Sequence, residues 1–399
     1  MSAPDSSAAP APGDRAPERD SRAHSELPLG WVLAAVGGAG ALAAAVTHPL
    51  DARLAAAQDW SPFVLVTGLL LVGRVAEDDG LFSAAGHLLA RTARSGLVLF
   101  LGAAVVVGIV TAILNLDTAV VFLTPVLVYT ARSRGEGDTA LVYGCLLLAN
   151  AGSLLLPGSN LTNLIVLGHL HISGGGFLAH TWLAWLAAVA VTAAVVVIFE
   201  RRSLRASARE LTSPERPVLG IGLAAVVSAT VLVLVLRSPA VPVAIVGFVG
   251  VALRAIGRKQ HLAPTLDTLG LPVLVGLFGV AVALGVLGRA WTGPAMALSH
   301  LDVWATAFVA AATSVLVNNL PAASLLAARV PHHPFALLVG LDIGPNLFVT
   351  GSLAWILWLR AARAAGARPS VAKAARLGIV AVPLSIVAAI GALLLTGSH

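Results

Sequence analysis

Clusters of asparagine, serine and threonine interrupt the most apolar stretches of this chain. NAGSLLLPGSNLTNLIV, at residues 150–166, carries three asparagines, two serines, a threonine and a Pro-Gly pair. DIGPNLFVTGS, at residues 342–352, combines similar residues with a Gly-Pro pair. Amide and hydroxyl groups beside a helix break can coordinate a small polar solute or an ion inside a membrane. No nucleophile is paired with a base, so the sequence favours binding over catalysis and does not predict an enzyme.

The composition indicates the kind of protein in which these clusters lie. Of 399 residues, 58% are hydrophobic and only 11% are charged, and the mean hydropathy is +0.90. Soluble proteins carry about a quarter charged residues, so we expect an all-α polytopic membrane protein. The arginines cluster in short loops, which argues against nucleic-acid binding. Cys145 is the sole cysteine and excludes a multi-thiolate metal site, so we expect no bound metal and no cofactor.

Apolar stretches long enough to cross a bilayer, at about 20 residues each, recur along the chain. They are 29–49, 62–76, 96–131, 138–170, 176–199, 218–236, 239–256, 271–289, 301–330, 334–358 and 371–396. The stretches 96–131 and 301–330 contain polar breaks at LNLDT and VNNLPA, and we expect each to turn back as a re-entrant hairpin. The proline-glycine pairs in 138–170 and 334–358 predict two discontinuous helices. We therefore expect nine crossings and two hairpins.

The basic residues predict the orientation of these spans. All but four of the 25 lysines and arginines fall in the N-terminal tail or in the five loops that this topology places inside. The exceptions are Arg53, Arg237, Arg289 and Arg329. The positive-inside rule then places the N-terminus in the cytoplasm and the C-terminus outside.

The chain also predicts a repeated organisation. VLVTGLLLV at 64–72 is echoed by VLVGLFGVA at 273–281, and each half carries one hairpin break and one broken helix. Matches at a nearly constant offset indicate a repeat, and in this topology the copies are inverted, as in many transporters. We expect the following units: a disordered cytoplasmic tail at 1–28, a first transmembrane repeat at 29–200, a cytoplasmic linker at 201–217 and a second transmembrane repeat at 218–399.

The candidate site residues come from the four breaks. Substrate-binding candidates are Asn115, Thr118, Asn150, Ser159, Asn160, Thr162, Asn163, Asn318, Asn319, Asn346, Thr350, Gly351 and Ser352. Asp117 and Asp342 are candidates for ion or proton coupling, because a carboxylate at mid-bilayer costs at least about 2.5 kcal/mol and usually has a function there. The structural alternatives are helix kinks repaired by neighbouring groups and, for Asp117 and Asp342, helix caps. Trp182, Trp185, Trp355 and Trp358 are typical of an interfacial belt.

Five segments resemble the arsenite/antimonite efflux permeases of the ion transporter superfamily, in order and spacing, from about residue 30 to the C-terminus. They are LNLDTAVVFLTPVL, NAGSLLLPGSNLTNL, LPVLVGLFGVAVALG, VNNLPAASLL and GLDIGPNLFVTGSLAWILWLR. The superfamily also contains dicarboxylate and sulfate symporters and sodium/proton antiporters.

The resemblance implies a multi-pass protein of a bacterial cytoplasmic (inner) membrane. It implies export of arsenite or antimonite by alternating access, driven by protons or membrane potential, in some members with a cytoplasmic ATPase partner. It also implies that the hairpin tips and broken helices surround the substrate. The alternatives are a sodium- or proton-coupled transporter for an inorganic anion or dicarboxylate, and a membrane scaffold that transports nothing. The first half lacks the initial helix that many members of the permease family carry.

Overall fold

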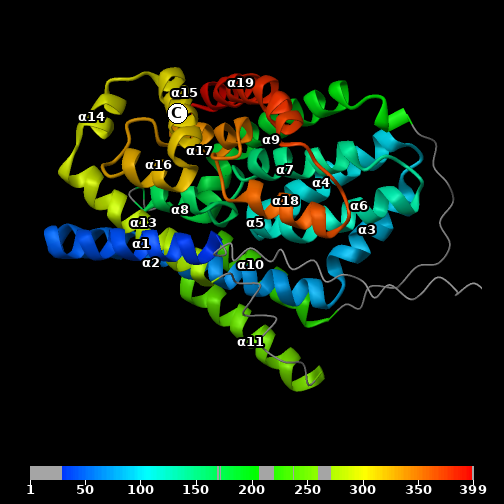
Figure 1. The fold of residues 1–399 in the computed structure, drawn as a ribbon, viewed down its shortest axis with the longest axis horizontal. Helices are drawn as coiled ribbons and strands as arrows, with labels where there is room; N and C mark the ends of the chain where they lie inside the picture. The colour runs from blue at the N-terminus through cyan, green and yellow to red at the C-terminus, as the bar shows by residue number, and fades with distance from the viewer. Residues whose placement is uncertain are drawn as a thin grey trace, which may run out of the picture.

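The computed structural model describes residues 29–168, 170, 172–205, 220–236, 238–258 and 271–397. The predicted tail at 1–28 and most of the predicted linker lie outside these residues. Every element in the described part is helical, with no strand, which confirms the all-α prediction (Figure 1).

The first half contains twelve helical elements in the described residues. They are α1 (Leu29–Thr47), α2 (Pro49–Asp78), α3 (Leu81–Thr92), α4 (Gly96–Ile113), α5 (Leu116–Thr118), η1 (Ala119–Leu123), α6 (Thr124–Ser133), α7 (Thr139–Gly152), η2 (Pro157–Ser159), α8 (Leu161–Leu167), α9 (Gly174–Phe199) and η3 (Ser203–Arg205).

The second half has a similar order of elements. They are α10 (Ile221–Val235), α11 (Ala240–Arg258), α13 (Leu271–Ala290), α14 (Gly293–Ser299), α15 (Val303–Val317), α16 (Asn319–Leu326), α17 (Pro334–Ile343), η4 (Gly344–Leu347), α18 (Ala354–Ala364) and α19 (Val371–Thr396). In both halves a long helix is followed by a short helix, a hairpin, a broken helix and a long closing helix. The inverted relation of the halves remains a prediction.

Six helices of the described chain are long and apolar enough to cross a membrane. They contain Gly30–Thr47, Pro49–Asp78, Gly96–Ile113, Gly174–Phe199, Leu271–Ala290 and Val371–Thr396. The predicted span 62–76 is too short, because α2 is a single helix of 30 residues. Pro49 lies in its first turn, where proline is favoured, and α2 continues through Pro62. Charged residues near its start lower the local hydropathy, so the apolar stretch begins only at residue 62.

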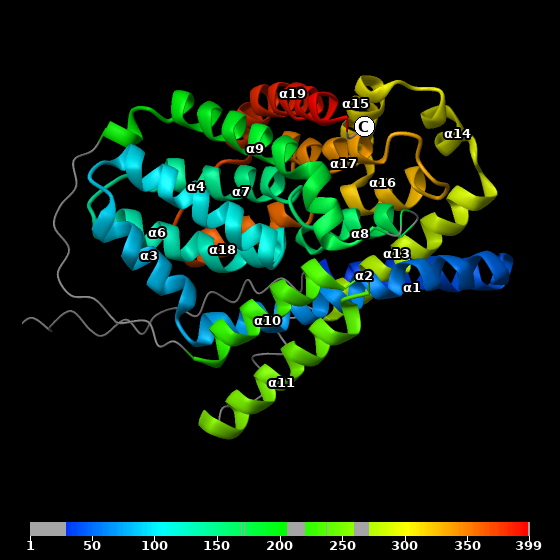
Figure 2. The same ribbon diagram turned by 180° about the vertical axis from the view of Figure 1, so that it is seen from behind.

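The helices form two groups that lie side by side (Figures 1 and 2). The first group consists of α1, α2, α10, α11 and α13, and the second contains the hairpins, the broken helices, α9 and α19. In the first group α1 and α13 cross so closely that a Cβ on Gly276 would overlap the Leu33 backbone. In the second group α9 and α19 pack together, with Thr192 and Ser385 hydrogen-bonded at 3.0 Å between them.

All four predicted breaks are present. The arms α4 and α6 both pack against α3, so the chain turns back near Asn115. The arms α15 and α16 pack against each other and meet at Asn318. The other two breaks separate α7 from α8 and α17 from α18, and both are longer than a proline kink, since 153–160 and 344–353 contain no α-helix. These interruptions expose backbone groups that neighbouring side chains must satisfy.

Candidate functional site

The tip of the first hairpin is organised by Asn115. Its backbone is extended, with φ −173°, and its Oδ1 accepts a hydrogen bond of 2.6 Å from the Thr118 backbone N–H. Asn115 is therefore the N-cap of α5, the role that the structural alternative gave to Asp117. Asp117 lies within the first turn and is only partly buried. Its carboxylate makes no hydrogen bond or ion pair to another described residue, so it remains available to a substrate or proton.

The tip of the second hairpin is held against the second broken helix. Asn318 Oδ1 accepts a 3.4 Å hydrogen bond from the Leu320 backbone N–H, and Asn318 Nδ2 donates to the Thr350 carbonyl at 3.1 Å. The Asn319 backbone N–H donates to the Gly351 carbonyl at 2.8 Å. Asn318 has φ 78°, the only positive value among the described non-glycine residues. This backbone conformation is strained for a residue with a Cβ atom and is typical of functional sites.

The first broken helix is closed by its own polar side chains. Ser159 Oγ donates to the carbonyls of Ser153 and Leu156. Asn163 Nδ2 donates to the same two carbonyls, at 2.7 Å and 3.3 Å. Ser159 and Asn163 therefore satisfy backbone acceptors that the break has freed. Ser153, which the sequence analysis did not select, is part of this network, and its position in NAGSLLLPGSN was the available signal.

Asp342 links the two halves of the site. Its side chain is fully buried, and its Oδ1 accepts hydrogen bonds from Asn160 Nδ2 at 2.8 Å and from Thr162 Oγ1 at 2.7 Å. Both donors belong to the first half, whereas Asp342 ends α17 in the second half. The structure thus brings Asn160, Thr162 and Asp342 into one hydrogen-bonded cluster.

Two further contacts join the broken helices. Asn346 Nδ2 donates to the Leu147 carbonyl at 2.9 Å, and Ser352 Oγ donates to Asn150 Oδ1 at 3.4 Å. All four residues are buried. Asn150, Asn346 and Ser352 therefore hold α7 against the second break, and Ser352 also reaches the cavity described below.

Tryptophan side chains bind carbonyl groups at the breaks. Trp355 Nε1 donates to the Pro345 carbonyl at 2.8 Å, and Trp185 Nε1 donates to the Gly152 carbonyl at 3.1 Å. The prediction of an interfacial belt is wrong for Trp355 and Trp358, because both side chains are fully buried. A sequence pattern cannot separate the two roles, since an indole needs one polar partner in either setting.

The four breaks meet at one small cavity of about 30 Å³. Five predicted site residues line it, together with leucines from α5, α8, α13, α16 and the second break. The lining is Asp117, Asn160, Asn318, Asn319 and Ser352, with Leu116, Leu161, Leu277, Leu320 and Leu353. No lysine or arginine contributes to this lining. A cavity of this size holds about one or two waters, so a larger solute requires the tips to separate.

Several buried polar atoms without hydrogen-bond partners belong to the first hairpin tip and the two broken helices, on residues outside the cavity lining itself. In the described part of the chain they include Asn115 Nδ2, Thr118 Oγ1, Asn163 Oδ1, Asp342 Oδ2 and Asn346 Oδ1. A buried polar group left unpaired costs about 1–3 kcal/mol. Such groups are typical of a site that exchanges partners with a solute or with water.

Comparison with known proteins gives one family and several relatives. The family described as "Citrate transporter" matches residues 25–359. The chain is 25% identical over 368 residues to the "Arsenical pump membrane protein" of Yersinia enterocolitica, covering 84% of this chain and 85% of that protein. The protein of the same name from Escherichia coli is 24% identical over 368 residues, with the same shares covered. An uncharacterized transporter of Mycobacterium tuberculosis is 25% identical over 364 residues, covering 82% of this chain and 84% of the relative.

The chain is also similar to solved structures, among them the following. The work titled "Crystal structure of the Alcanivorax borkumensis YdaH transporter reveals an unusual topology" describes a chain with 16% sequence identity and a TM-score of 0.49. The match covers 84% of this chain and 84% of that chain.

Proposed function

This chain is a membrane transporter of the citrate transporter family, and we propose that it exports arsenite or antimonite across the cytoplasmic membrane by secondary active transport. The relatives named as arsenical pump membrane proteins support this choice within the family. The proposed coupling is to protons or to the membrane potential, with the two halves alternating access to one site.

The lining of the four-break cavity carries the proposal. Arsenous acid, As(OH)3, is a neutral trihydroxy molecule near pH 7, so amide and hydroxyl groups can bind it through hydrogen bonds. The cavity offers Asn160, Asn318, Asn319 and Ser352 for this purpose. These groups bind weakly enough to release the substrate, whereas a set of thiolates would hold trivalent arsenic tightly. Cys145, the sole cysteine, is buried outside the cavity lining, and its Sγ accepts a hydrogen bond of 3.4 Å from the Thr124 hydroxyl.

Asp117 is the proposed coupling residue at this cavity. It is the only ionisable side chain in the lining, and it belongs to the hairpin tip. In a low-dielectric site a carboxyl group is more easily accommodated when it is neutral. Proton binding at Asp117 can therefore accompany movement of the tip. Asp342 does not line the cavity, but its Oδ1 accepts hydrogen bonds from Asn160, which does, and from Thr162.

The family description favours a second candidate, a sodium- or proton-coupled transporter for citrate or another anion. A polyanion normally requires arginine, lysine, a metal ion or several backbone amides in its site. The described cavity lining holds no cationic side chain and carries one carboxylate. This electrostatic setting favours the neutral substrate over the anion unless sodium binds first.

The test is export from cells that lack their own arsenite efflux system. We expect the parent chain to raise arsenite resistance and lower metalloid accumulation, and Asp117→Asn to abolish both effects. Asp302→Asn is the matched control, because Asp302 is exposed and caps α15 through the Ala305 backbone N–H at 2.7 Å, a role that asparagine retains. The control should transport like the parent.

Substrate and partner assays separate the remaining alternatives. Well-expressed parent protein that gives no resistance would reject arsenite as the substrate. Sodium-stimulated uptake of citrate in the same membranes would then support the anion transporter. Export that occurs only when a cytoplasmic ATPase is co-expressed would show that this partner is required.

A further inference from the structure

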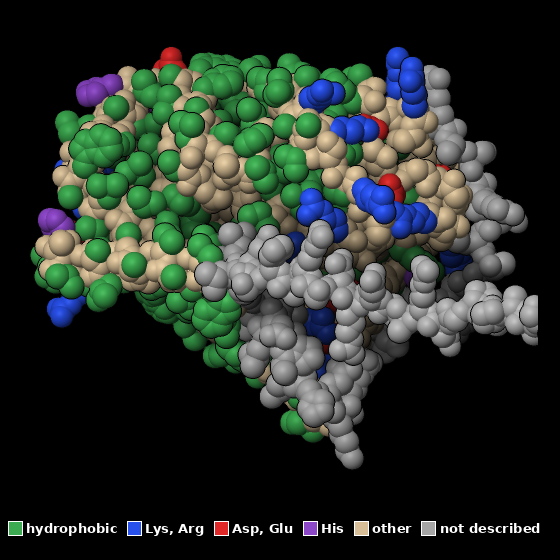
Figure 3. All heavy atoms as spheres, in the orientation of Figure 1, with side chains coloured by type: hydrophobic (Ala, Val, Ile, Leu, Met, Phe, Trp, Pro, Cys, Tyr) green, Lys and Arg blue, Asp and Glu red, His purple; other side chains and the backbone are tan. Residues whose placement is uncertain are grey.

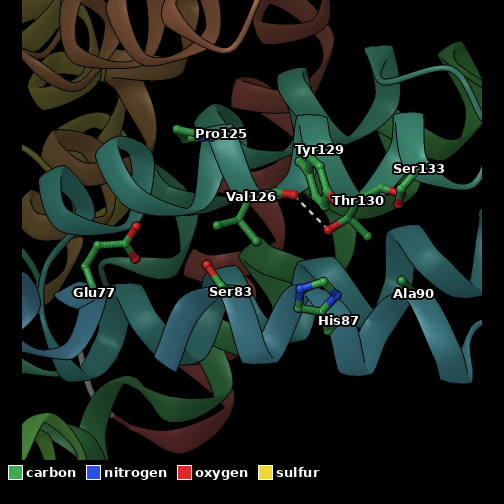
Figure 4. Close-up of a pocket in the computed structure, with 10 residues that line it drawn as sticks. Glu77, Ser83, His87, Ala90, Pro125, Val126, Tyr129, Thr130 and Ser133 are labelled. Atoms are coloured by element: carbon green, nitrogen blue, oxygen red, sulfur yellow. Dashed lines mark hydrogen bonds between the residues drawn. The ribbon is translucent and has the colours of Figure 1, made fainter. Parts of the chain in front are cut away.

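A second, larger cavity lies between α3 and α6, outside the four-break site (Figure 4). Its volume is about 540 Å³, within the range of small-molecule sites. Figure 4 shows side chains of both helices directed toward the space between them. The lining is Glu77, Ser83, Gly86, His87, Ala90, Pro125, Val126, Tyr129, Thr130 and Ser133.

Glu77 is the only carboxylate of this lining. It lies near the end of α2, and its carboxylate points toward the space between α3 and α6 (Figure 4). Its Oε2 is shielded from solvent and has no hydrogen-bond partner. A buried carboxylate oxygen without a donor is costly, and protonation or a bound cation removes that cost. The described contacts of Glu77 therefore leave room for a proton or cation.

One face of α2 packs against the first hairpin tip at Gly73 and carries Glu77 one helical turn further on. At Gly73, a Cβ atom would lie 2.6 Å from Thr118 Cγ2 and 3.5 Å from Thr118 Oγ1. Thr118 follows Asp117 directly, and its hydroxyl has no hydrogen-bond partner. Residues 73 and 77 lie on the same helix face, about 6 Å apart along the axis. Asp117 and Thr118 of the tip are thus followed by Gly73 and Glu77 of α2, and Glu77 lines the cavity.

The charges around Glu77 place this end of the molecule at the cytoplasmic side. Lys and Arg side chains gather over the half of the molecule that contains α3 and α6 (Figure 3). The positive-inside rule assigns such an end to the cytoplasm. Close to Glu77, Arg74 pairs with Asp78 at 2.8 Å on α2, and Arg254 of α11 contacts Asp78 and Asp79. His87 on α3 and Tyr129 on α6 are the other titratable groups that line the cavity.

We propose that the α3–α6 cavity is the cytoplasmic vestibule of the proton pathway, and that Glu77 exchanges the coupling proton between Asp117 and the cytoplasm. This inference rests on the proposed function. Protonated Asp117 gives its proton through the Thr118 hydroxyl and water to the Glu77 carboxylate. Glu77 then releases the proton to water in the vestibule, and Asp117 is left as the carboxylate that can accept the next proton.

Cysteine labelling tests the vestibule without any transported substrate. Because Cys145 is the sole cysteine, Cys145→Ala gives a cysteine-free chain. In that background Ser83→Cys and Ser133→Cys should react with a membrane-impermeant maleimide applied from the cytoplasmic side only. Ser314→Cys is the control and should stay unlabelled, because Ser314 is fully buried. Cavity cysteines that do not react, or that react only from outside, would overturn the vestibule.

Proton movement in proteoliposomes tests the role of Glu77. With purified full-length protein and a trapped pH dye, we expect Glu77→Gln to reduce arsenite-driven proton movement about a hundredfold. Arsenite binding to the same variant should be unchanged, and Glu77→Asp should restore much of the movement. Glu200→Gln is the matched control, since Glu200 pairs with Lys373 at 2.7 Å and does not line the cavity.

The two proposals fail in different ways. A parent chain that moves no protons with arsenite rejects the proposed coupling and the Glu77 relay with it, while the labelling result still decides the vestibule. A parent that couples normally, together with a Glu77→Gln variant that couples equally well, rejects the relay alone.

Discussion

The two intramembrane carboxylates, Asp117 in the first half and Asp342 in the second, have opposite surroundings. Asp342 is fully buried and receives hydrogen bonds from Asn160 and Thr162 on one oxygen. Asp117 is partly exposed, lines the cavity and has no such donors among the described residues. One carboxylate therefore holds the halves together, and the other faces the space that a substrate would enter. The two carboxylates therefore differ in both burial and hydrogen bonding.

The two hairpin tips also differ in how many hydrogen bonds they make to the rest of the site. The first tip makes its capping bond within the hairpin, from Thr118 to Asn115. The second tip is tied to the second broken helix by Asn318 and Asn319. The first tip therefore makes fewer hydrogen bonds to other parts of the site than the second tip does. If one tip moves during transport while the other stays with its broken helix, the first is better suited to move.

Removing the Asp342 carboxylate should have the largest effect. Asp342→Ala leaves the amide of Asn160 and the hydroxyl of Thr162 without their acceptor, and we expect a loss of about 2–4 kcal/mol in the free energy of unfolding together with loss of transport. Asp342→Asn keeps an acceptor oxygen and should retain most of the stability. Unfolding of the purified variants in detergent, followed by tryptophan fluorescence, measures the difference. Equal stability of both variants and the parent would show that Asp342 does not hold the halves together.

Replacing Asp117 should abolish transport but leave the stability of the protein almost unchanged. Asp117→Asn removes a charge that has no described partner, so the free energy of unfolding should change by less than about 0.5 kcal/mol. Arsenite efflux from the same variant should fall to background. A strongly destabilised Asp117→Asn protein would mean that Asp117 has a structural partner, and the contrast with Asp342 would disappear.

The sequence predicted the positions of all four breaks but not how each break is satisfied. Proline, glycine and asparagine mark an interruption through local backbone chemistry, which can be read from the chain. The donor for the Pro345 carbonyl is Trp355, ten positions away, and the donors to Asp342 come from the other half of the chain. Such partners depend on tertiary packing. Aromatic and polar residue types alone do not distinguish a lipid-facing tryptophan from one that completes a break.

The tryptophans that donate to the two breaks, Trp355 and Trp185, give a test with a smaller expected loss of stability. Trp355→Phe removes the fully buried donor to the Pro345 carbonyl, and we expect a loss of about 1–2 kcal/mol in the free energy of unfolding. Trp185 is only partly buried, and its bond to the Gly152 carbonyl is longer, at 3.1 Å. Trp185→Phe should therefore lose less than about 1 kcal/mol. Chemical unfolding of both variants decides the order, and a larger loss for Trp185→Phe would contradict the tighter second break.

The last comparison concerns the backbone of the hairpin tips. Asn318 has φ 78°, whereas Asn115 has φ −173° in the extended region that any residue adopts. Replacing either asparagine removes its cap, so the informative quantity is the difference between glycine and alanine at each site. At position 318 glycine should be more stable than alanine by about 1–2 kcal/mol, because only glycine adopts the positive φ without strain.

At position 115 the order of glycine and alanine should reverse. The extended backbone strains neither residue there, and glycine loses more conformational freedom on folding, which costs about 0.5–1 kcal/mol relative to alanine. Free energies of unfolding for the four variants, measured under one condition, test this sign change. The same sign at both positions would mean that the two tips share one backbone conformation in the membrane. The asymmetry between the halves would then be confined to their carboxylates and tryptophans.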